Sequence, residues 1–180
     1  SIYNKTKMVA ERVVLSYSDH FPVHCIRPAT VCGMSSRMRL DVSVNMLAFQ
    51  ALENKKITVF GGEQTRPNIH IKDMVEVYKH FLKSPQIESG CYNAGFENIS
   101  ILEIAKKVKR YFNDCEIVIS PSNDPRSYRQ DSQKLLDTGF IKNFSVDNAI
   151  QDIVESYKKG DLKNLDEWYT VKTMKNKNVT

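Results

Sequence analysis

The sequence predicts an α/β fold, and three observations support this class. Segments with apolar residues at helical spacing alternate along the chain with short β-branched runs, as in folds that pack helices against a sheet. The 180 residues are enough for a domain with a buried core, and a hydrophobic content of 41% is ordinary for a globular protein. Proline or glycine closes several strand-like runs, as at Pro28 and Gly61-Gly62.

Each expected helix is marked by apolar residues on one face, and two helices also carry a cap. Phe21-Pro22 ends the first helix. Asp73 is expected to cap the third, and Ser100 with Glu103 forms a capping box at the start of the fourth. In chain order, the expected helices cover residues 2–19, 42–54, 74–83, 101–112, 132–137 and 146–159.

The expected strands are short apolar runs between turn residues. They cover residues 23–27, 57–60, 68–71, 90–94 and 116–119. Since Pro28 ends the first strand, residues 29–33 are expected to form a loop at its carboxyl end. In open α/β sheets, ligands bind at that edge. Beyond Asp161 we expect a loosely ordered tail that Trp168 anchors.

Composition and charge exclude two classes of protein. No stretch approaches the ~20 apolar residues of a membrane span, so we expect no membrane partner. The formal net charge is +5, but lysines of the tail contribute much of it. We expect no nucleic-acid partner either, because the sequence shows no basic face interleaved with aromatic residues.

The cysteines and histidines show no metal-ligand spacing. The four cysteines form no C-x-x-C pair, and Cys25 and Cys91 lie in apolar, strand-like runs where a free thiol behaves as a small hydrophobe. We therefore expect reduced thiols, a cytoplasmic protein and no metal site.

Tyr3 and Lys7 are the strongest candidates for chemistry. Four residues apart on a helix, they share one face. A lysine ammonium favours the charged phenolate of a neighbouring tyrosine, which brings a proton acceptor nearer to neutral pH. The same ammonium keeps donors for a sugar or ribose hydroxyl. On these two residues alone, a solvated tyrosine beside a solvated lysine is the alternative interpretation.

Several arginines lie in expected loops. Arg37 and Arg39 follow the first strand, Arg66 precedes the strand over 68–71, and Arg126 and Arg129 lie in a later loop. Paired guanidinium groups can fork onto phosphate oxygens. Surface arginines without a ligand are the alternative interpretation.

Seven motifs occur in order along the chain, and the family match that they support extends to about Lys159. They are Ser1-x-Tyr3-x-x-x-Lys7, Ile26-Arg27-Pro28-Ala29-Thr30-Val31-Cys32-Gly33, Ala51-Leu52-Glu53-Asn54-Lys55, Val59-Phe60-Gly61-Gly62, Arg66-Pro67-Asn68-Ile69-His70-Ile71-Lys72-Asp73, Tyr92-Asn93-Ala94-Gly95 and Ser127-Tyr128-Arg129-Gln130-Asp131. Together they resemble the extended short-chain dehydrogenase/reductase family, specifically its nucleotide-sugar epimerases and dehydratases. Cys32 departs from the tyrosine that the family commonly has at this position.

The resemblance implies roles for ten residues. Tyr3 would be the catalytic acid and base on a sugar hydroxyl or carbonyl, supported by Lys7. The residues implied to bind the cofactor are Tyr3, Lys7, Pro28, Ala29 and Val31. Those implied to bind the substrate are Thr30, Asn45, Arg66, Asn93 and Arg126, with the two arginines on the diphosphate.

The resemblance also implies a cofactor and partners. The cofactor would be NAD, with NADP as an open alternative, and the substrate a nucleoside-diphosphate sugar. The helix that carries Tyr3 often forms a dimer interface in this family, so a homodimer is implied. The outward apolar residues of this helix are also consistent with burial against the missing half, and the sequence does not decide between the two. Epimerase and dehydratase activity stay open, and a non-catalytic nucleotide-binding protein of the same fold or an inactive fragment is the alternative.

The implied fold is the C-terminal part of a Rossmann-like extended short-chain dehydrogenase/reductase together with the smaller α/β substrate-binding domain. Residues 1–33 would end the dinucleotide-binding domain, 34–160 would mainly bind the nucleotide sugar with some segments returning to the first domain, and 161–180 would form the tail. The chain contains no G-x-x-G-x-x-G run. We therefore expect that a preceding half is missing and that the fragment alone is inactive.

Overall fold

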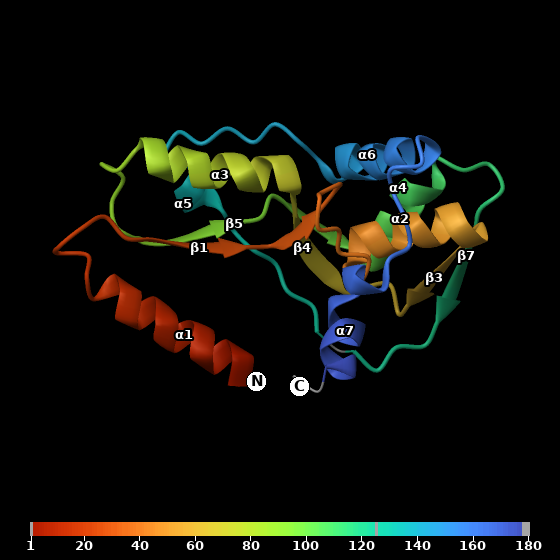
Figure 1. Cartoon of the computed structure of the whole chain (residues 1–180), viewed down its shortest axis with the longest axis horizontal. Coiled ribbons are helices and arrows are strands. Elements are labelled where there is room, and N and C mark those ends of the chain that lie inside the picture. Colours follow the sequence, from red (N-terminus) through yellow and green to blue (C-terminus); the bar gives the residue numbers. More distant parts are fainter. Residues whose placement is uncertain (1, 125, 178–180) are drawn as a thin grey trace.

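Three small β-sheets run through the molecule from one end to the other (Figure 1). The computed structural model describes residues 2–124 and 126–177. Strand β1 (His24–Pro28) pairs in parallel with β5 (Gly90–Ala94), and β3 (Lys56–Phe60) pairs in parallel with β7 (Glu116–Ser120). The middle sheet places β4 (Thr65–His70) between a parallel β2 (Thr30–Cys32) and an antiparallel β6 (Glu97–Ser100).

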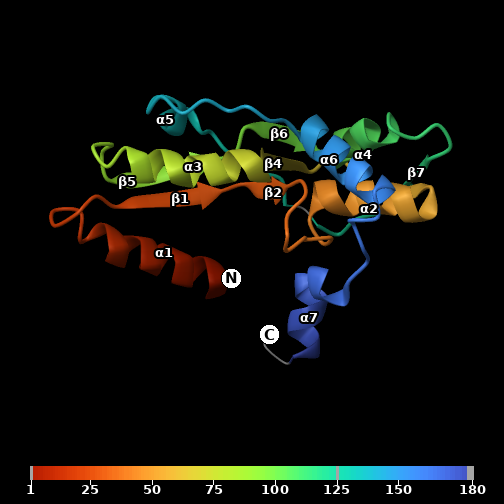
Figure 2. The ribbon, with the colours of Figure 1, turned by 45° about the horizontal axis from the view of Figure 1, so that its top comes forward.

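Helices cover these sheets, so the predicted α/β class is confirmed. In chain order they are α1 (Ile2–Leu15), α2 (Ser43–Asn54), α3 (Ile71–Lys83), α4 (Ile101–Lys109), α5 (Gln133–Leu136), α6 (Val146–Lys158), the 3₁₀ helix η1 (Asp166–Trp168) and α7 (Thr170–Asn176). Helices α1 and α3 flank opposite faces of the β1–β5 sheet in both views (Figures 1 and 2). Helices α2, α4 and α6 gather at the other end of the molecule.

The buried apolar side chains form two clusters. The larger one joins α2, α4 and α6 to β3 and includes Leu47, Ile57, Ile104 and Ile150, all fully buried. The smaller one joins α3, β5 and α5. Apolar burial of this kind is the main stabilising term of folding.

Two strands were not expected from the sequence. Residues 30–32, predicted to lie in a loop, form β2, because Thr30 and Cys32 find register partners on β4 at Asn68 and His70. β6 was not predicted because its four residues, all half-buried, do not alternate between apolar and polar side chains. Its last residue, Ser100, is also the cap of α4. The predicted capping box of Ser100 and Glu103 is confirmed.

The first helix is shorter than expected. It ends at Leu15 rather than Asp19, and the amides of Tyr17 and Ser18 then bond to carbonyls three residues back. The Ser16 hydroxyl donates to the Val13 carbonyl at 2.8 Å, a local side-chain bond that competes with continuation of the helix.

Asp73 was wrongly predicted to cap the third helix. Helix α3 begins earlier, at Ile71, and its N-cap is His70, whose Nδ1 accepts from the Lys72 amide at 3.1 Å. Asp73 is fully buried in the first turn, where its carboxylate accepts from the amides of Asn143 and Phe144, each at 3.0 Å. A histidine cap has no sequence signature comparable to those of Ser, Thr, Asp or Asn.

The tail expected to be loosely ordered contains η1 and α7 where the structure describes it. Trp168 is buried, as expected, and its carbonyl accepts from the Leu40 amide at 2.9 Å. Residues 178–180 lie outside the described residues, as do Ser1 and Pro125. Among the helices of the described chain, none has both the length and the apolar content needed to cross a membrane.

The His70 cap makes the fold acid-sensitive. Burial is the main cause that lowers the pKa of His70, and the nearby Lys72 lowers this pKa further against the opposing Asp152 carboxylate. The unfolded chain therefore takes up the proton at a higher pH than the folded chain, and stability is lost as the pH falls below about 6.5. The variant His70→Asn keeps a side chain that can cap the helix. We predict that it lowers the slope of unfolding free energy against pH by up to about 1.4 kcal/mol per pH unit.

The measurement is the free energy of unfolding in urea between about pH 5 and pH 8, the range in which a histidine changes its charge. His20→Asn, at an exposed turn position, is the matched control. An unchanged pH slope in His70→Asn would contradict the assignment.

Candidate functional site

A cleft of about 690 Å³ opens at the carboxyl ends of β1 and β5. Five of the residues singled out in the sequence line it: Tyr3, Pro28, Ala29, Thr30 and Asn93. They come from α1, from the β1–β2 junction and from β5, so segments about 90 residues apart meet at one edge. This is the edge at which open α/β sheets bind ligands, and the volume is in the range of ligand pockets.

Other residues of the cleft were not assigned to a site from the sequence. Arg39 lies after β2, and the remaining ones lie on β4 or in the segment before α5: Pro67, Tyr128, Arg129, Gln130 and Asp131. The sequence signals for them were the loop arginines Arg39 and Arg129 and the two motifs that contain Pro67 and residues 128–131. Arg39 and Arg129 give the cleft a basic lining that Asp131 offsets in part.

The backbone at the cleft floor is closely packed. The Ala29 amide donates to the Ala94 carbonyl at 2.8 Å, which continues the β1–β5 pairing to the cleft. A Cβ on Gly95 would lie 2.5 Å from the Ala29 Cβ and 2.4 Å from Gln130 Oε1. Glycine at position 95 therefore lets β5 and the Gln130 segment approach each other.

Gln130 joins the far wall of the cleft to β1. Its Nε2 donates to the Arg27 carbonyl at 2.8 Å, and its backbone amide donates to Asn98 Oδ1 at 2.8 Å. Its Oε1 is buried without a hydrogen-bond partner in the described part of the chain. A buried acceptor of this kind costs free energy unless a donor reaches it, so it is a candidate contact for a ligand.

Tyr3 reaches the cleft from a helix that lies on the surface. None of the described residues of α1 is buried, and Tyr3 itself is 67% exposed. The Lys7 ammonium lies 5.7 Å from the centre of the Tyr3 ring, so the two side chains share a face as expected. Lys7 itself does not line the cleft.

An ion pair fixes α1 to β1. Arg27 donates from Nε and Nη2 to the two carboxylate oxygens of Glu11, at 2.8 and 2.6 Å. The same carboxylate accepts from the Cys91 thiol of β5 at 3.7 Å. The Arg27 guanidinium holds the pKa of Glu11 below its usual range, so the pair stays charged at neutral pH.

Arg66 and Arg126 lie close together beside the cleft. Arg66 Nη1 donates to the Arg126 carbonyl, and both guanidinium groups contact Asp124. Arg66 is largely buried, with 14% of its side chain exposed, and its guanidinium carbon lies 5.2 Å from the centre of the Tyr128 ring that lines the cleft. Arg126 is 76% exposed. The two arginines thus form a basic cluster that does not itself line the cleft but adjoins it through Tyr128.

Two of the implied site residues lie elsewhere. Asn45, on α2, is 2% exposed, accepts from the Gly33 amide at 3.0 Å and donates to the Arg39 carbonyl at 2.9 Å. It therefore holds the loop that carries Arg39 rather than lining the cleft. Val31, in the middle of β2, packs against the smaller hydrophobic cluster.

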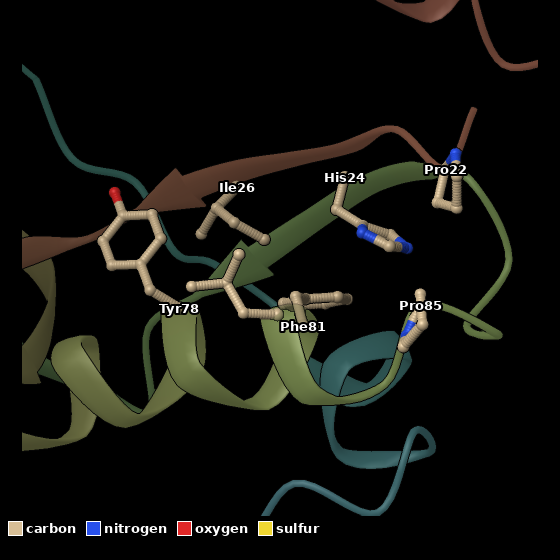
Figure 3. A pocket seen from close by; sticks show the side chains of 7 residues that line it. Pro22, His24, Ile26, Tyr78, Phe81 and Pro85 are labelled. Atoms are coloured by element: carbon tan, nitrogen blue, oxygen red, sulfur yellow. The ribbon is translucent and has the colours of Figure 1, made fainter. Parts of the chain in front are cut away.

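A second cavity, of about 440 Å³, lies between β1 and α3 (Figure 3). The side chains of Ile26, His24, Tyr78 and Phe81 point into it from the two elements. The ring of His24 lies 4.7 Å from that of Phe81, and its Nε2 bonds the Ile87 carbonyl at 2.9 Å. With this mainly apolar lining and no pair of charged groups among its lining residues, this cavity is the weaker candidate for chemistry.

Comparisons with known proteins give similarities over most of the chain. Residues 1–95 match the sequence pattern described as the NAD dependent epimerase/dehydratase family. The chain is 31% identical over 135 residues to "Uncharacterized UDP-glucose epimerase YtcB" of Bacillus subtilis (strain 168), covering 68% of this chain and 42% of that protein. It is 33% identical over 112 residues to "dTDP-D-glucose 4,6-dehydratase" of Dictyostelium discoideum, covering 59% and 25%.

A solved structure with a similar fold is the UDP-glucuronic acid 4-epimerase from Bacillus cereus in complex with UDP-glucuronic acid and NAD. The TM-score is 0.74 at 25% identity, over 88% of this chain and 53% of that one. This chain therefore spans about half of that enzyme and less than half of the two curated relatives.

The exposed position of α1 generates a prediction. A helix of 14 residues is marginally stable in water when nothing packs against it, so α1 depends on its link to β1. We predict that Arg27→Gln speeds amide exchange over residues 2–15 by about two- to fivefold, the effect of losing a partly exposed bidentate pair. Hydrogen–deuterium exchange with mass spectrometry measures this rate.

Lys79→Gln, which removes the exposed Lys79–Glu76 pair on α3, is the matched control and should leave α1 unchanged. Equal exchange of α1 in Arg27→Gln and the unsubstituted protein would show that the ion pair does not hold the helix.

Proposed function

The chain belongs to the NAD-dependent epimerase/dehydratase family, and on that premise we propose that it is the catalytic and substrate-binding part of a nucleotide-sugar epimerase or dehydratase. The resemblance to extended short-chain dehydrogenases/reductases that the sequence motifs indicate is thereby confirmed, as is the α/β fold of that class. The observation that carries the proposal is that Tyr3, which has the Lys7 ammonium beside its ring, lines one cleft together with residues at the ends of β1 and β5.

The residues of the cleft fit a nicotinamide cofactor. Pro28 and Ala29 form a small apolar wall, and the unpaired Gln130 Oε1 could accept from an amide N–H such as that of a carboxamide. The Lys7 ammonium would bind the hydroxyls of the adjoining ribose. The family is NAD-dependent, so NAD is the assigned cofactor. When bound, it accepts a hydride from a sugar carbon and later returns it.

Tyr3 would move the proton in this reaction. Its phenolate oxygen takes the proton of the sugar hydroxyl while that carbon becomes a carbonyl, and its phenol gives a proton back when the keto sugar is reduced. Lys7 would assist this transfer from its place beside Tyr3, where its ammonium lies 5.7 Å from the centre of the tyrosine ring. Rotation of the keto sugar before reduction gives an epimerase, and loss of water gives a dehydratase.

The substrate proposed for the cleft is a nucleoside-diphosphate sugar. Arg66 and Arg126 provide forked donors suited to a diphosphate, and Thr30 and Asn93 line the part of the cleft near Tyr3 where the sugar would lie. The relatives point to the same class of ligand, since they are named for UDP-glucose and dTDP-glucose and the solved epimerase holds UDP-glucuronic acid.

Three further parts of the proposal concern the whole protein. The exposed apolar residues of α1, including Met8, Val9 and Val13, suit a homodimer interface. The 180 residues alone would not convert the nucleotide sugar, because the sequence has no glycine-rich loop to hold the cofactor's diphosphate. A cytoplasmic location is proposed because all four cysteines are free thiols.

The role of Tyr3 is tested by Tyr3→Phe in the complete protein. We predict a fall in kcat of about 10²- to 10⁴-fold, the usual share of a general acid–base, with cofactor binding unchanged because the ring is kept. Turnover of UDP-glucose or UDP-glucuronic acid and retention of NAD are the two measurements. Tyr17→Phe, at an exposed tyrosine just after the same helix, is the control. Full activity of Tyr3→Phe would refute the assignment.

A further inference from the structure

Asp124 lies between the two arginines of the basic cluster. Arg126 donates to it from Nε at 2.7 Å, from Nη2 at 2.7 Å and from its backbone amide at 3.1 Å. Arg66 Nη2 lies 3.3 Å from its Oδ2. The Asp124 backbone is held as well, because its amide donates to Ser122 Oγ at 3.1 Å and its carbonyl accepts from Gln64 Nε2 at 3.3 Å. One carboxylate therefore contacts both guanidinium groups.

The two arginines differ in their freedom to leave Asp124. Arg66 also donates from Nη1 to the carbonyls of Thr65 and Arg126, and its side chain is largely buried. Arg126 is exposed, and the side-chain contacts that the structure gives it within the described residues are with Asp124. Arg126 can thus turn toward an incoming anion at the cost of its bonds to Asp124, while Arg66 stays fixed.

The carboxylate also changes the charge of the cluster. With Asp124 ionised, the formal charge of the three side chains is +1 rather than the +2 of the two arginines. The hydrogen bonds from Arg126 are the main cause that holds the pKa of Asp124 well below its usual range, so this charge persists at every working pH.

We propose that Asp124 is a resident counter-anion of the diphosphate-binding arginines, and that it weakens nucleotide-sugar binding by competing for Arg126 and by repelling the diphosphate. The inference rests on the proposed function, because it assumes that Arg66 and Arg126 bind the diphosphate. Its consequence is faster release of the nucleotide-sugar product, since the carboxylate is in place to take Arg126 back.

The alternative role for Asp124 is to position the arginines for the ligand. The two roles predict opposite effects of removing its charge. If Asp124 is a counter-anion, the variant without its charge binds the diphosphate more tightly. If Asp124 positions the arginines, the same variant binds the diphosphate more weakly.

The test is calorimetric titration of UDP into the complete protein. Asp124→Asn removes the charge and keeps a side chain that can accept from Arg126. We expect the Kd for UDP to fall about three- to tenfold, as for removing one like charge some 6 Å from a dianion in a water-like dielectric. Asp114→Asn makes the same charge change at an exposed site paired with Lys55 and should leave the Kd unchanged.

Arg126→Ala separates the two hypotheses. If it weakens UDP binding while Asp124→Asn strengthens binding, the inference stands. If both variants weaken binding, or Asp124→Asn has no effect, Asp124 is not a counter-anion although the proposed function holds. If Arg126→Ala leaves UDP binding unchanged, or the unsubstituted protein binds neither UDP nor dTDP, the assignment of these arginines to the diphosphate is wrong. Asp124→Ala, checked by thermal unfolding, repeats the measurement should Asp124→Asn be unfolded.

Discussion

The candidate site depends on one ion pair, the bidentate bridge from Arg27 to Glu11. None of the described residues of α1 is buried, so hydrophobic packing does not fix that helix within this chain. The guanidinium of Arg27 holds α1 from one side, and its carbonyl accepts from Gln130 on the opposite wall of the cleft. A single residue of β1 is therefore bonded both to the Tyr3 helix and to Gln130 of the cleft lining.

Strand β4 links the second half of the site to the core. Its second residue is Arg66, whose guanidinium packs on Tyr128. Its last residue is His70, which caps α3. Between them, Asn68 and Ile69 are buried and pair with β2. The pairing of β4 with β2 therefore holds Arg66 in place relative to the β1–β2 junction.

The sequence predicted the features that depend on local chemistry. The class, most helices, and the Ser100–Glu103 capping box follow from periodicity and side-chain caps, and the Tyr3–Lys7 pair follows from helical spacing. Features that depend on distant partners were missed. β2 exists because β4 lies beside it, and Gln130 enters the cleft through bonds to Arg27 and Asn98. Likewise, the burial of Asn45 against Gly33 and Arg39 depends on tertiary contacts, so a family motif could not distinguish a ligand contact from a structural one.

The exposure of Tyr3 bears on how these residues can act. Proton transfer beside a hydride transfer is favoured in a site that excludes water, because electrostatic interactions strengthen as the dielectric falls. Tyr3 is 67% exposed and the cleft is open, so the elements described here do not shield the proposed proton carrier from water. The chain spans about half of the solved epimerase it resembles. On the proposed function, the part that this chain contributes is the positioning of the proton at Tyr3 and of the diphosphate at Arg66 and Arg126.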